Sequence, residues 1–248
     1  MIEHPSSRQS IFHFPARPEY RFDNFIVSEG SRFAFACIRG LCSDKDIPYQ
    51  SLYLSGGPGM GKTHLLMAAG NHLAETGSPE RPLYIHCHDL TGALDRGDAA
   101  IPGRLDSPDA RADFLLLDDI DAVTGHSAAQ EALYRIYNQT LETGGKMIFA
   151  GRTTADRLKE TESFLTSRFK WGMTAEIQPM NDEATAQLFH KLAGDQGLEI
   201  PDKIIQYLLT RIGRDFSSVK DAVTRINEES LRQKHKVTLP LIKTALDL

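Results

Sequence analysis

Residues 51–75 read SLYLSGGPGMGKTHLLMAAGNHLAE. In this stretch a short apolar run, a glycine-rich segment and a segment of helical period follow one another. Residues 52–54 are an apolar run bounded by serines, which is typical of a short buried parallel strand. A glycine-rich segment follows, and beyond it Leu65, Ala69 and Leu73 fall on one face of a helix. The order of strand, glycine-rich loop and helix predicts the first unit of an α/β layer.

The same alternation continues along the chain to about residue 177. Short apolar runs bounded by turn or charged residues occur at 83–85, 114–117 and 147–150. The segments between them carry a helical period, which is clearest in residues 127–143. Strands that alternate with helices predict a parallel sheet with right-handed crossover connections.

Beyond residue 178 the pattern changes to consecutive amphipathic helices. Asn181 is the expected N-cap of the first helix, and Pro201 opens a second that Gly213 ends. Ser218 begins a capping box for a third helix, and Pro240 opens the last. The expected fold class is α/β, with a P-loop parallel-sheet domain followed by a small all-helical lid domain. The expected boundaries are an N-terminal arm at 1–19, the α/β domain at 20–178 and the lid at 179–248.

Composition excludes several classes of protein. The chain has 248 residues, and its 28 Lys+Arg against 33 Asp+Glu give a net charge of −5, which excludes a histone-like basic coat. The start, MIEHPSSR, has no signal-peptide pattern, and no apolar run approaches the length of a membrane span. Cys37, Cys42 and Cys87 lack C-x-x-C spacing, which favours a reducing compartment. We therefore expect a cytoplasmic protein with no membrane partner.

The glycine-rich segment matches the phosphate-loop pattern G-x-x-x-x-G-K-[ST], between a strand and a helix as that pattern requires. Its glycines let successive backbone N–H groups point at phosphate oxygens at the start of a helix. Lys62 is expected to reach the β- and γ-phosphates, and the Thr63 hydroxyl to bind Mg²⁺. The predicted nucleotide-binding residues here are Gly57, Pro58, Gly59, Met60, Gly61, Lys62, Thr63 and His64.

Two carboxylates follow the apolar run at 114–117. Asp118 is expected near the Mg²⁺, and Asp119 is expected to orient an attacking water. The alternative is that both acids simply end the strand. His86 and His88 would share one face of a strand and could bind a metal, but the chain has no second pair of ligands at zinc spacing, which favours packing.

Four motifs together resemble the AAA+ ATPases, and among them the ATPase module of the replication initiator DnaA. They are YRFDNF at 20–25, GGPGMGKTHLL at 56–66, LLLDDID at 115–121 and SRFKWG at 167–172. The resemblance implies binding of ATP or ADP with Mg²⁺, and an adenine held by the segment that contains Phe22, Phe25 and Val27. It also implies that Arg168 is an arginine finger that reaches into a neighbouring subunit's ATP, an effect worth about 10³–10⁵ in rate.

The chain ends after the lid, where DnaA initiators continue into a helix-turn-helix domain, and in this it resembles the Hda group. That resemblance implies a regulator that promotes hydrolysis of DnaA-bound ATP while tethered to the sliding clamp. Residues 9–14 (QSIFHF) stand at the place of a clamp-binding peptide; the alternative is an arm packed on its own domain. The segment 89–112 has no basic stripe, so strong direct DNA binding is not expected. The sequence leaves open whether the chain forms a homo-oligomer.

Two positions depart from the family pattern. The polar sensor residue after the fourth apolar run, an Asp in DnaA-like proteins, is replaced by Arg152, or by Thr153 if the alignment shifts by one. The sensor arginine of the third lid helix is replaced by Ser217, with Arg214 nearby but more typical of a solvated side chain. A γ-phosphate without these partners is held weakly, so we expect slow intrinsic hydrolysis and a preference for ADP.

Three functions remain open at this point. The leading hypothesis is a nucleotide-dependent switch that presents Arg168 to DnaA. The second is a free-standing ATPase that loads a helicase or remodels DNA. The third is an adaptor whose nucleotide site is vestigial.

Overall fold

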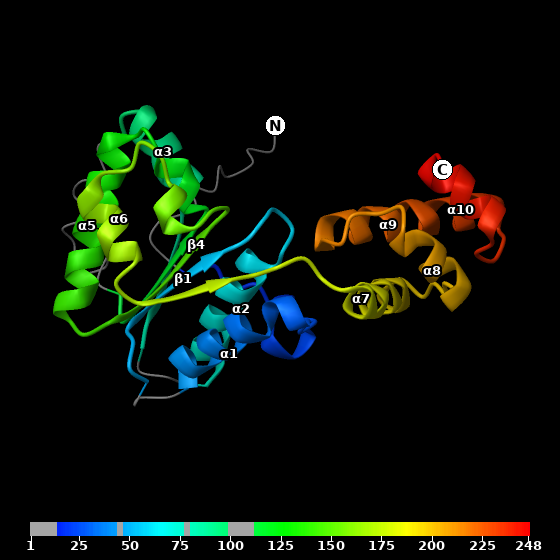
Figure 1. Cartoon of the computed structure of the whole chain (residues 1–248), viewed down its shortest axis with the longest axis horizontal. Coiled ribbons are helices and arrows are strands. Elements are labelled where there is room, and N and C mark those ends of the chain that lie inside the picture. Colours follow the sequence, from blue (N-terminus) through cyan, green and yellow to red (C-terminus); the bar gives the residue numbers. More distant parts are fainter. Residues whose placement is uncertain (1–13, 44–46, 77–79, 99–111) are drawn as a thin grey trace, which may run out of the picture.

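The structure is a computed structural model that describes residues 14–43, 47–76, 80–98 and 112–248. The chain forms two lobes, a sheet covered by helices and a group of helices at the C-terminal end (Figure 1). Both parts of the expected fold class are confirmed.

The sheet has five parallel strands in the order β2-β3-β4-β1-β5. The four strands predicted from apolar runs are confirmed, whereas the fifth, whose sequence MTAE has no apolar run, was not predicted. It lies at the edge of the sheet beside β1. The strands are β1 (Ser51–Ser55), β2 (Pro82–His86), β3 (Phe114–Asp118), β4 (Lys146–Gly151) and β5 (Met173–Glu176).

Helices cover both faces of the sheet and make three layers (Figure 1). Helices α1 (Glu29–Ser43) and α2 (Lys62–Glu75) pack on one face; α3 (Cys87–Asp95), α5 (Ser127–Glu142) and α6 (Ser163–Phe169) pack on the other. Strand residues alternate between the two cores: Leu52 and Leu54 join the α1 side, and Tyr53 joins the α5 side. Short 3-10 helices lie at Phe22–Asn24 (η1), Ile120–Val123 (η3) and Ala155–Arg157 (η4).

The C-terminal helices enclose an apolar core of their own. They are α7 (Asp182–Asp195), α8 (Asp202–Leu209), α9 (Phe216–Gln233) and α10 (Leu239–Leu246). Asn181 caps α7 as predicted, since its Oδ1 accepts the Ala184 N–H at 2.9 Å.

Two details of these helices differ from the expectation. Helix α8 ends at Leu209, four residues before Gly213. In the turn that follows, the Leu208 carbonyl accepts the N–H groups of Arg211 and Ile212. The cap of α9 is Asp215, not Ser218: the Asp215 carboxylate accepts both the backbone N–H and the hydroxyl of Ser218. Asp at an N-cap satisfies free N–H groups and offsets the positive end of the helix, so the carboxylate takes the capping role.

The two lobes meet beside the phosphate loop. Phe25 packs against the core shared with α1 and α2, whereas its neighbour Ile26 packs against the lid core. The Phe216 N–H, at the start of α9, donates to the Gly59 carbonyl at 3.0 Å. The segment expected to hold adenine and the phosphate loop therefore both contact the lid.

The N-terminal arm runs along α2. The Asn71 side-chain amide donates to the carbonyls of Arg17 and Tyr20, both at 2.7 Å. Phe14 packs so closely on Gly70 that a β-carbon there would overlap its ring. The expected clamp-binding residues 9–13 lie outside the described residues, and Phe14, the sixth position of that peptide, packs on its own domain.

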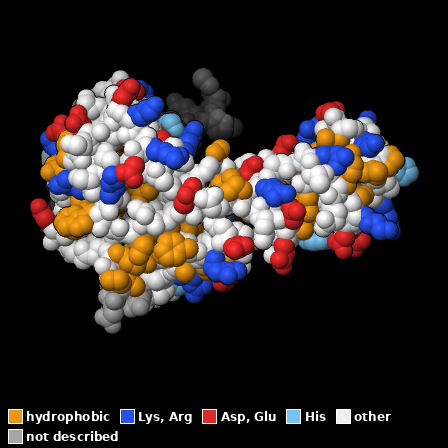
Figure 2. Space-filling view, viewed as in Figure 1, with side chains coloured by type: hydrophobic (Ala, Val, Ile, Leu, Met, Phe, Trp, Pro, Cys, Tyr) orange, Lys and Arg blue, Asp and Glu red, His pale blue; other side chains and the backbone are white. Residues whose placement is uncertain are grey.

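Three other features follow from the described part of the chain. Cys37, Cys42 and Cys87 are free thiols. Helices both apolar and long enough to cross a lipid bilayer are absent from this part. On the face shown in Figure 2, acidic and basic side chains are interspersed over both lobes. Residues 99–111, within the segment expected not to bind DNA strongly, lie outside the described residues.

Candidate nucleotide-binding site

The strand order brings four chain segments to one edge of the sheet. The carboxyl ends of β1, β4, β3 and β2 follow one another along this edge, with Ser55 opposite Gly151 and His86 opposite Asp118. Because neighbouring strands are about 4.8 Å apart, the residues that follow these strands lie within reach of one another. Ligands of open α/β sheets bind at this kind of edge.

The phosphate loop needs glycine at two positions. Gly59 and Gly61 have φ values of +70° and +89°, in the left-handed region that favours glycine. A β-carbon on Gly61 would lie 2.7 Å from Phe25 Cε2, and one on Gly59 would lie 2.6 Å from Asp215 Oδ1. The loop leads directly into α2 at Lys62, so the helix N-terminus faces the loop. This is a cradle for an anion, built of backbone.

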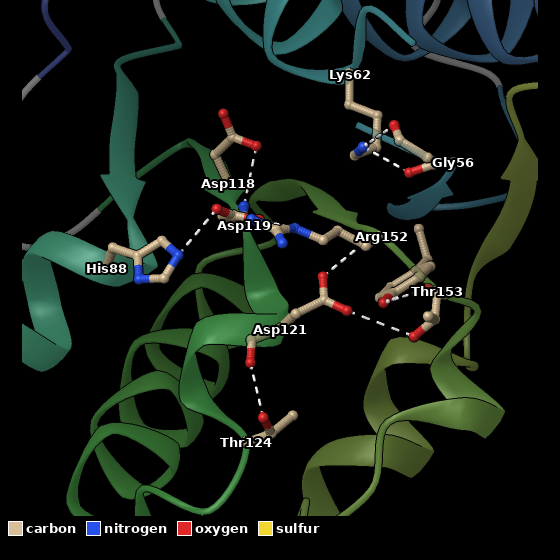
Figure 3. A network of polar contacts seen from close by, with 11 residues as sticks. Gly56, Lys62, His88, Asp118, Asp119, Asp121, Thr124, Arg152 and Thr153 are labelled. Atoms are coloured by element: carbon tan, nitrogen blue, oxygen red, sulfur yellow. Dashed lines mark hydrogen bonds and ion pairs between the residues drawn. The ribbon is translucent and has the colours of Figure 1, made fainter. Parts of the chain in front are cut away.

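Lys62 is buried and directed into the loop. Its Nζ donates to the carbonyls of Gly56 at 2.6 Å and Gly57 at 2.8 Å (Figure 3). Burial lowers the pKa of Lys62, and the charges of Asp118, Asp119 and Asp121 oppose this shift. The ammonium thus lies within the electrostatic influence of three carboxylates that follow β3.

The remaining predicted residues of the loop differ in exposure. Pro58 and Thr63 are exposed, and Gly57 is partly exposed. The Met60 side chain is partly buried against the α1 and α2 core. The Thr63 hydroxyl is in the first turn of α2.

Asp118 is 2% exposed, at the end of β3. Its Oδ1 accepts the Asp119 N–H at 2.9 Å, and its Oδ2 accepts the Tyr84 hydroxyl at 3.0 Å. Burial first, and then the Asp118 charge, raise the pKa of Tyr84, so this hydroxyl stays a donor. A carboxylate has about four lone-pair positions, so Asp118 keeps room for a cation. Together with the Thr63 hydroxyl it offers the oxygen ligands that Mg²⁺ prefers.

Asp119 adopts a left-handed backbone with φ 57°. Its Oδ2 lies 3.1 Å from His88 Nε2, and its Oδ1 lies 3.4 Å from Arg152 Nε (Figure 3). The expectation that His86 and His88 share a strand face is wrong, because β2 ends at His86 and α3 begins at Cys87. His88 therefore lies in the first turn of a helix. The described residues contain no group of three or more His, Cys, Asp or Glu side chains that could hold a metal ion.

The structure also decides which residue follows β4. The strand ends at Gly151, so Arg152 comes directly after it and Thr153 is one further on. Asp121 fixes both: its Oδ2 accepts the Arg152 N–H at 2.5 Å, and its Oδ1 accepts the Thr153 hydroxyl at 3.4 Å. The Tyr53 hydroxyl donates to the Thr153 carbonyl at 3.0 Å.

The predicted adenine segment is built from packed rings. The Phe22 ring is 7% exposed and packs edge-on against Phe35 and His72, so it supports the segment from within. Phe25 stacks on Phe35, while Val27 is 40% exposed.

His64 links this segment to α2. Its Nε2 donates to the Arg21 carbonyl at 3.0 Å, and its ring packs edge-on against Tyr20 and Phe25. Burial lowers the pKa of His64, which favours the neutral ring. The side chain thus faces residues 20–25 and not the phosphate loop.

The lid side of the site contributes an acid, and the position expected for a sensor arginine is Ser217. Ser217 is exposed in the first turn of α9, and Arg214 forms an ion pair with Asp182 at 2.7 Å. Asp215 instead lies against Gly59.

Arg168 lies elsewhere. Its Nη1 donates to the Phe164 carbonyl at 2.8 Å, and its Nη2 donates to the Tyr134 hydroxyl at 3.3 Å. The guanidinium carbon is 4.4 Å from the centre of the Tyr134 ring, a cation–π contact. Arg168 Nε is buried without a partner in the described part of the chain. Helix α6 packs on the sheet face opposite α2, the helix that starts at the phosphate loop.

The sequence of the chain matches two protein-family profiles. The profile described as bacterial DnaA ATPase domain matches residues 16–176, which is most of the chain. The chain belongs to the bacterial DnaA ATPase-domain family. The profile described as Hda, lid domain matches residues 182–246. The chain is therefore a DnaA/Hda-like AAA+ module.

Relatives and solved structures agree with this assignment. The chain is 29% identical to the chromosomal replication initiator protein DnaA of Symbiobacterium thermophilum, over 92% of this chain and 50% of that protein. It is 28% identical to DnaA of Lactiplantibacillus plantarum over the same shares. The chain thus spans about half the length of these curated relatives.

Two structures show the same fold. Domain III of the Thermotoga maritima replication initiation protein DnaA has a TM-score of 0.84 at 24% identity, covering 94% of this chain and 98% of that one. AMPPCP-bound DnaA from Aquifex aeolicus has a TM-score of 0.76 at 26% identity, covering 88% of this chain and 69% of that one.

Sequence reasoning missed three residues at this site: His88 as a partner of Asp119, Asp121 as the anchor of Arg152, and Asp215 on the phosphate loop. A usable signal existed for the first two. Each follows a strand by a few residues, and the carboxyl ends of parallel strands meet at one edge. Asp215 gave no such signal, because its place depends on how the lid packs.

Proposed function

We propose that this chain is a nucleotide-binding regulator of replication initiation, which promotes hydrolysis of the ATP bound to DnaA in concert with the sliding clamp. In this proposal residues 1–19 are the clamp-binding arm, 20–178 the nucleotide-binding domain and 179–248 the lid. Membership of the DnaA ATPase-domain family and the match of the lid to Hda support it.

The nucleotide would bind in the phosphate loop, and the similar DnaA of Aquifex aeolicus has been solved bound to AMPPCP. Lys62 would neutralise phosphate charge, and Thr63 and Asp118 would hold Mg²⁺, which supplies positive charge to the phosphates. Because Phe216 and Asp215 of the lid contact Gly59, and Ile26 joins the lid core, a bound nucleotide would bias the orientation of the lid.

The proposed action on a partner rests on the position of Arg168. Its side chain is held by α5 and α6, on the sheet face opposite α2. A guanidinium in that place serves a nucleotide bound by a neighbouring molecule. Its planar charge would neutralise the phosphoryl group in transfer. The buried Nε without a partner has one donor to spare when such a neighbour docks.

The test of this function is hydrolysis of DnaA-bound ATP, measured with and without this protein and with clamp loaded on DNA. We expect stimulation that requires both the protein and the clamp. Turnover without DnaA would favour a free-standing ATPase. Retained clamp binding without stimulation would favour an adaptor.

The two phenylalanines at the apolar positions of the clamp-binding peptide are Phe12 and Phe14. Phe14 is partly buried against Gly70, so its ring is committed to the domain. We propose that Gln9 and Phe12 carry the contact with the clamp, since an extended peptide can place such side chains in a partner's pockets.

Phe12→Ala is therefore expected to abolish recovery of the clamp in a pull-down while leaving stability unchanged. Phe14→Ala is the matched control and should retain the clamp. It is expected to lower the free energy of unfolding in urea by about 1–2 kcal/mol, because burying a whole Phe is worth roughly 1.5–3 kcal/mol and this one is partly buried. Equal clamp recovery by wild type and Phe12→Ala would contradict the proposal.

A further inference from the structure

Basic side chains gather at the end of the lid. Residues 230–246 contain no Asp or Glu in a chain whose net charge is −5, and they contain four basic residues: Arg232, Lys234, Lys236 and Lys243. Because α9 starts beside Gly59 and has 18 residues, its end lies roughly 27 Å along the helix from the phosphate loop. Figure 1 shows this end of the lid lying away from the sheet. The basic segment is therefore separate from the nucleotide site.

Three lysines of this segment keep their charge available. They are exposed and form no ion pair within the described residues, and we call them the basic patch: Lys234, Lys236 and Lys243. The other basic residue, Arg232, is paired with Glu229 at 2.6 Å. The acid that follows the segment, Asp247, is paired with Arg225 at 2.6 Å. The positive charge of the patch is thus left for a partner.

The loop that carries the patch is held by the lid. Lys234 ends α9 with a left-handed backbone, at φ 54°. The Ser230 hydroxyl donates to the His235 carbonyl at 2.7 Å, and the His235 N–H donates to the Ser230 carbonyl at 3.2 Å. Val237 is buried in the lid core. A backbone fixed in this way lowers the entropy lost when the lysines bind a partner.

A hollow of about 380 Å³ lies between the end of α9 and the start of α10. Its walls include five polar side chains: Gln233, His235, Lys236, Thr238 and Thr244. Pro240 also lines the hollow, and Lys243 follows it by three residues, so both lie on the same side of α10. Lysine, threonine and glutamine are side chains that bind the phosphate oxygens of DNA. The hollow therefore adds hydrogen-bonding groups to the charge of the patch.

The surroundings of the patch favour duplex DNA over other polyanions. The apolar residues Leu241, Ile242 and Ala245 of α10 are buried in the lid core, so this face of the helix is not available to a lipid bilayer. Leu231 and Leu239 are exposed nearby, and lipid vesicles are therefore one arm of the test. The segment contains no Phe, Tyr or Trp on which the bases of a single strand could stack. What remains is contact with the backbone of a duplex.

We propose that the basic patch binds the phosphate backbone of duplex DNA, weakly and without sequence preference. The contact goes beyond the proposed function and requires neither nucleotide nor DnaA. Each lysine neutralises about one phosphate and releases counterions, so three lysines give a slope of log K against log salt of about −2.7. The Kd at physiological salt is on the order of 10⁻⁴ M, the weak end of non-specific binding. This agrees with the lack of a basic stripe in residues 89–112.

The test is fluorescence anisotropy of a labelled mixed-sequence duplex, titrated with the purified chain between about 50 and 200 mM NaCl, without nucleotide, DnaA or clamp. Lys236→Ala/Lys243→Ala is expected to reduce the steepness of the salt slope by about 2. It should also raise the Kd at the lowest salt at least about tenfold, because two phosphate contacts are lost. Lys236→Arg/Lys243→Arg should keep the wild-type slope, since it keeps both charges.

Lys159→Ala/Lys203→Ala is the matched control, because it removes the same charge from two exposed lysines outside the patch. It should bind the duplex as wild type does. Thermal unfolding should be unchanged in all of these variants, since the substituted side chains are exposed.

A wild-type chain that does not bind the duplex at the lowest salt would overturn the proposal, and so would an unchanged salt slope in folded Lys236→Ala/Lys243→Ala. Tighter binding to a single strand of the same length would also contradict it. The same holds for vesicles of phosphatidylcholine and phosphatidylserine, if the chain binds them in preference to the duplex. A chain that binds the duplex but does not stimulate DnaA would refute only the proposed function.

Discussion

Lys62→Ala is expected to weaken the binding of ATP and of ADP by about 10²-fold or more. Lys62 is the buried cation of the phosphate loop, with its ammonium 2.6 and 2.8 Å from two loop carbonyls. Truncating one partner of a buried, hydrogen-bonded charge pair costs roughly 2–5 kcal/mol, and each 1.4 kcal/mol is tenfold in affinity. Calorimetric titration with each nucleotide and Mg²⁺ measures the effect.

Lys203→Ala is the matched control, because Lys203 is an exposed lysine on lid helix α8. It should bind nucleotide as wild type does. Both variants should unfold cooperatively near the wild-type temperature, since within the described part of the chain the Lys62 ammonium hydrogen-bonds to two loop carbonyls and to no other element of the fold. Wild-type affinity in a folded Lys62→Ala variant would refute the assignment of the site.

Arg168→Ala is expected to reduce the stimulated hydrolysis of DnaA-bound ATP by about 10³-fold or more, the usual contribution of an arginine finger. The chain's own affinity for nucleotide should stay within about twofold of wild type, because α6 packs on the sheet face opposite α2. Single-turnover hydrolysis with loaded clamp measures the first quantity, and calorimetry measures the second.

Arg135→Ala serves as control, since Arg135 is an exposed arginine on neighbouring α5 that pairs with Glu131. Arg168→Lys should restore little, because an ammonium lacks the planar fork of a guanidinium. A folded Arg168→Ala variant that stimulates as well as wild type would exclude the finger. One that loses its own nucleotide would place Arg168 in the chain's own site.

The sequence predicted the parts of the molecule whose signals are local. Four strands, the phosphate loop and the Asn181 cap could be read because burial, backbone freedom and helix capping each leave a pattern within a few residues. The strand β5 was not predicted, since its four residues pair at a sheet edge and need no apolar run. The cap of α9 was misplaced because Asp215 and Ser218 are both good caps, and only the structure shows which one accepts the bonds.

By itself the sequence determined that the chain has a phosphate loop, two acids at a strand end and an α/β domain with a helical lid, because each of these is written in neighbouring residues. Only the tertiary structure decided what each side chain of the site contacts. Strand order placed Arg152 and His88 on either side of Asp119, and lid packing brought Asp215 to Gly59. Such contacts join residues tens of positions apart, and the physical reason they are hidden in the sequence is that they arise only when the sheet is assembled.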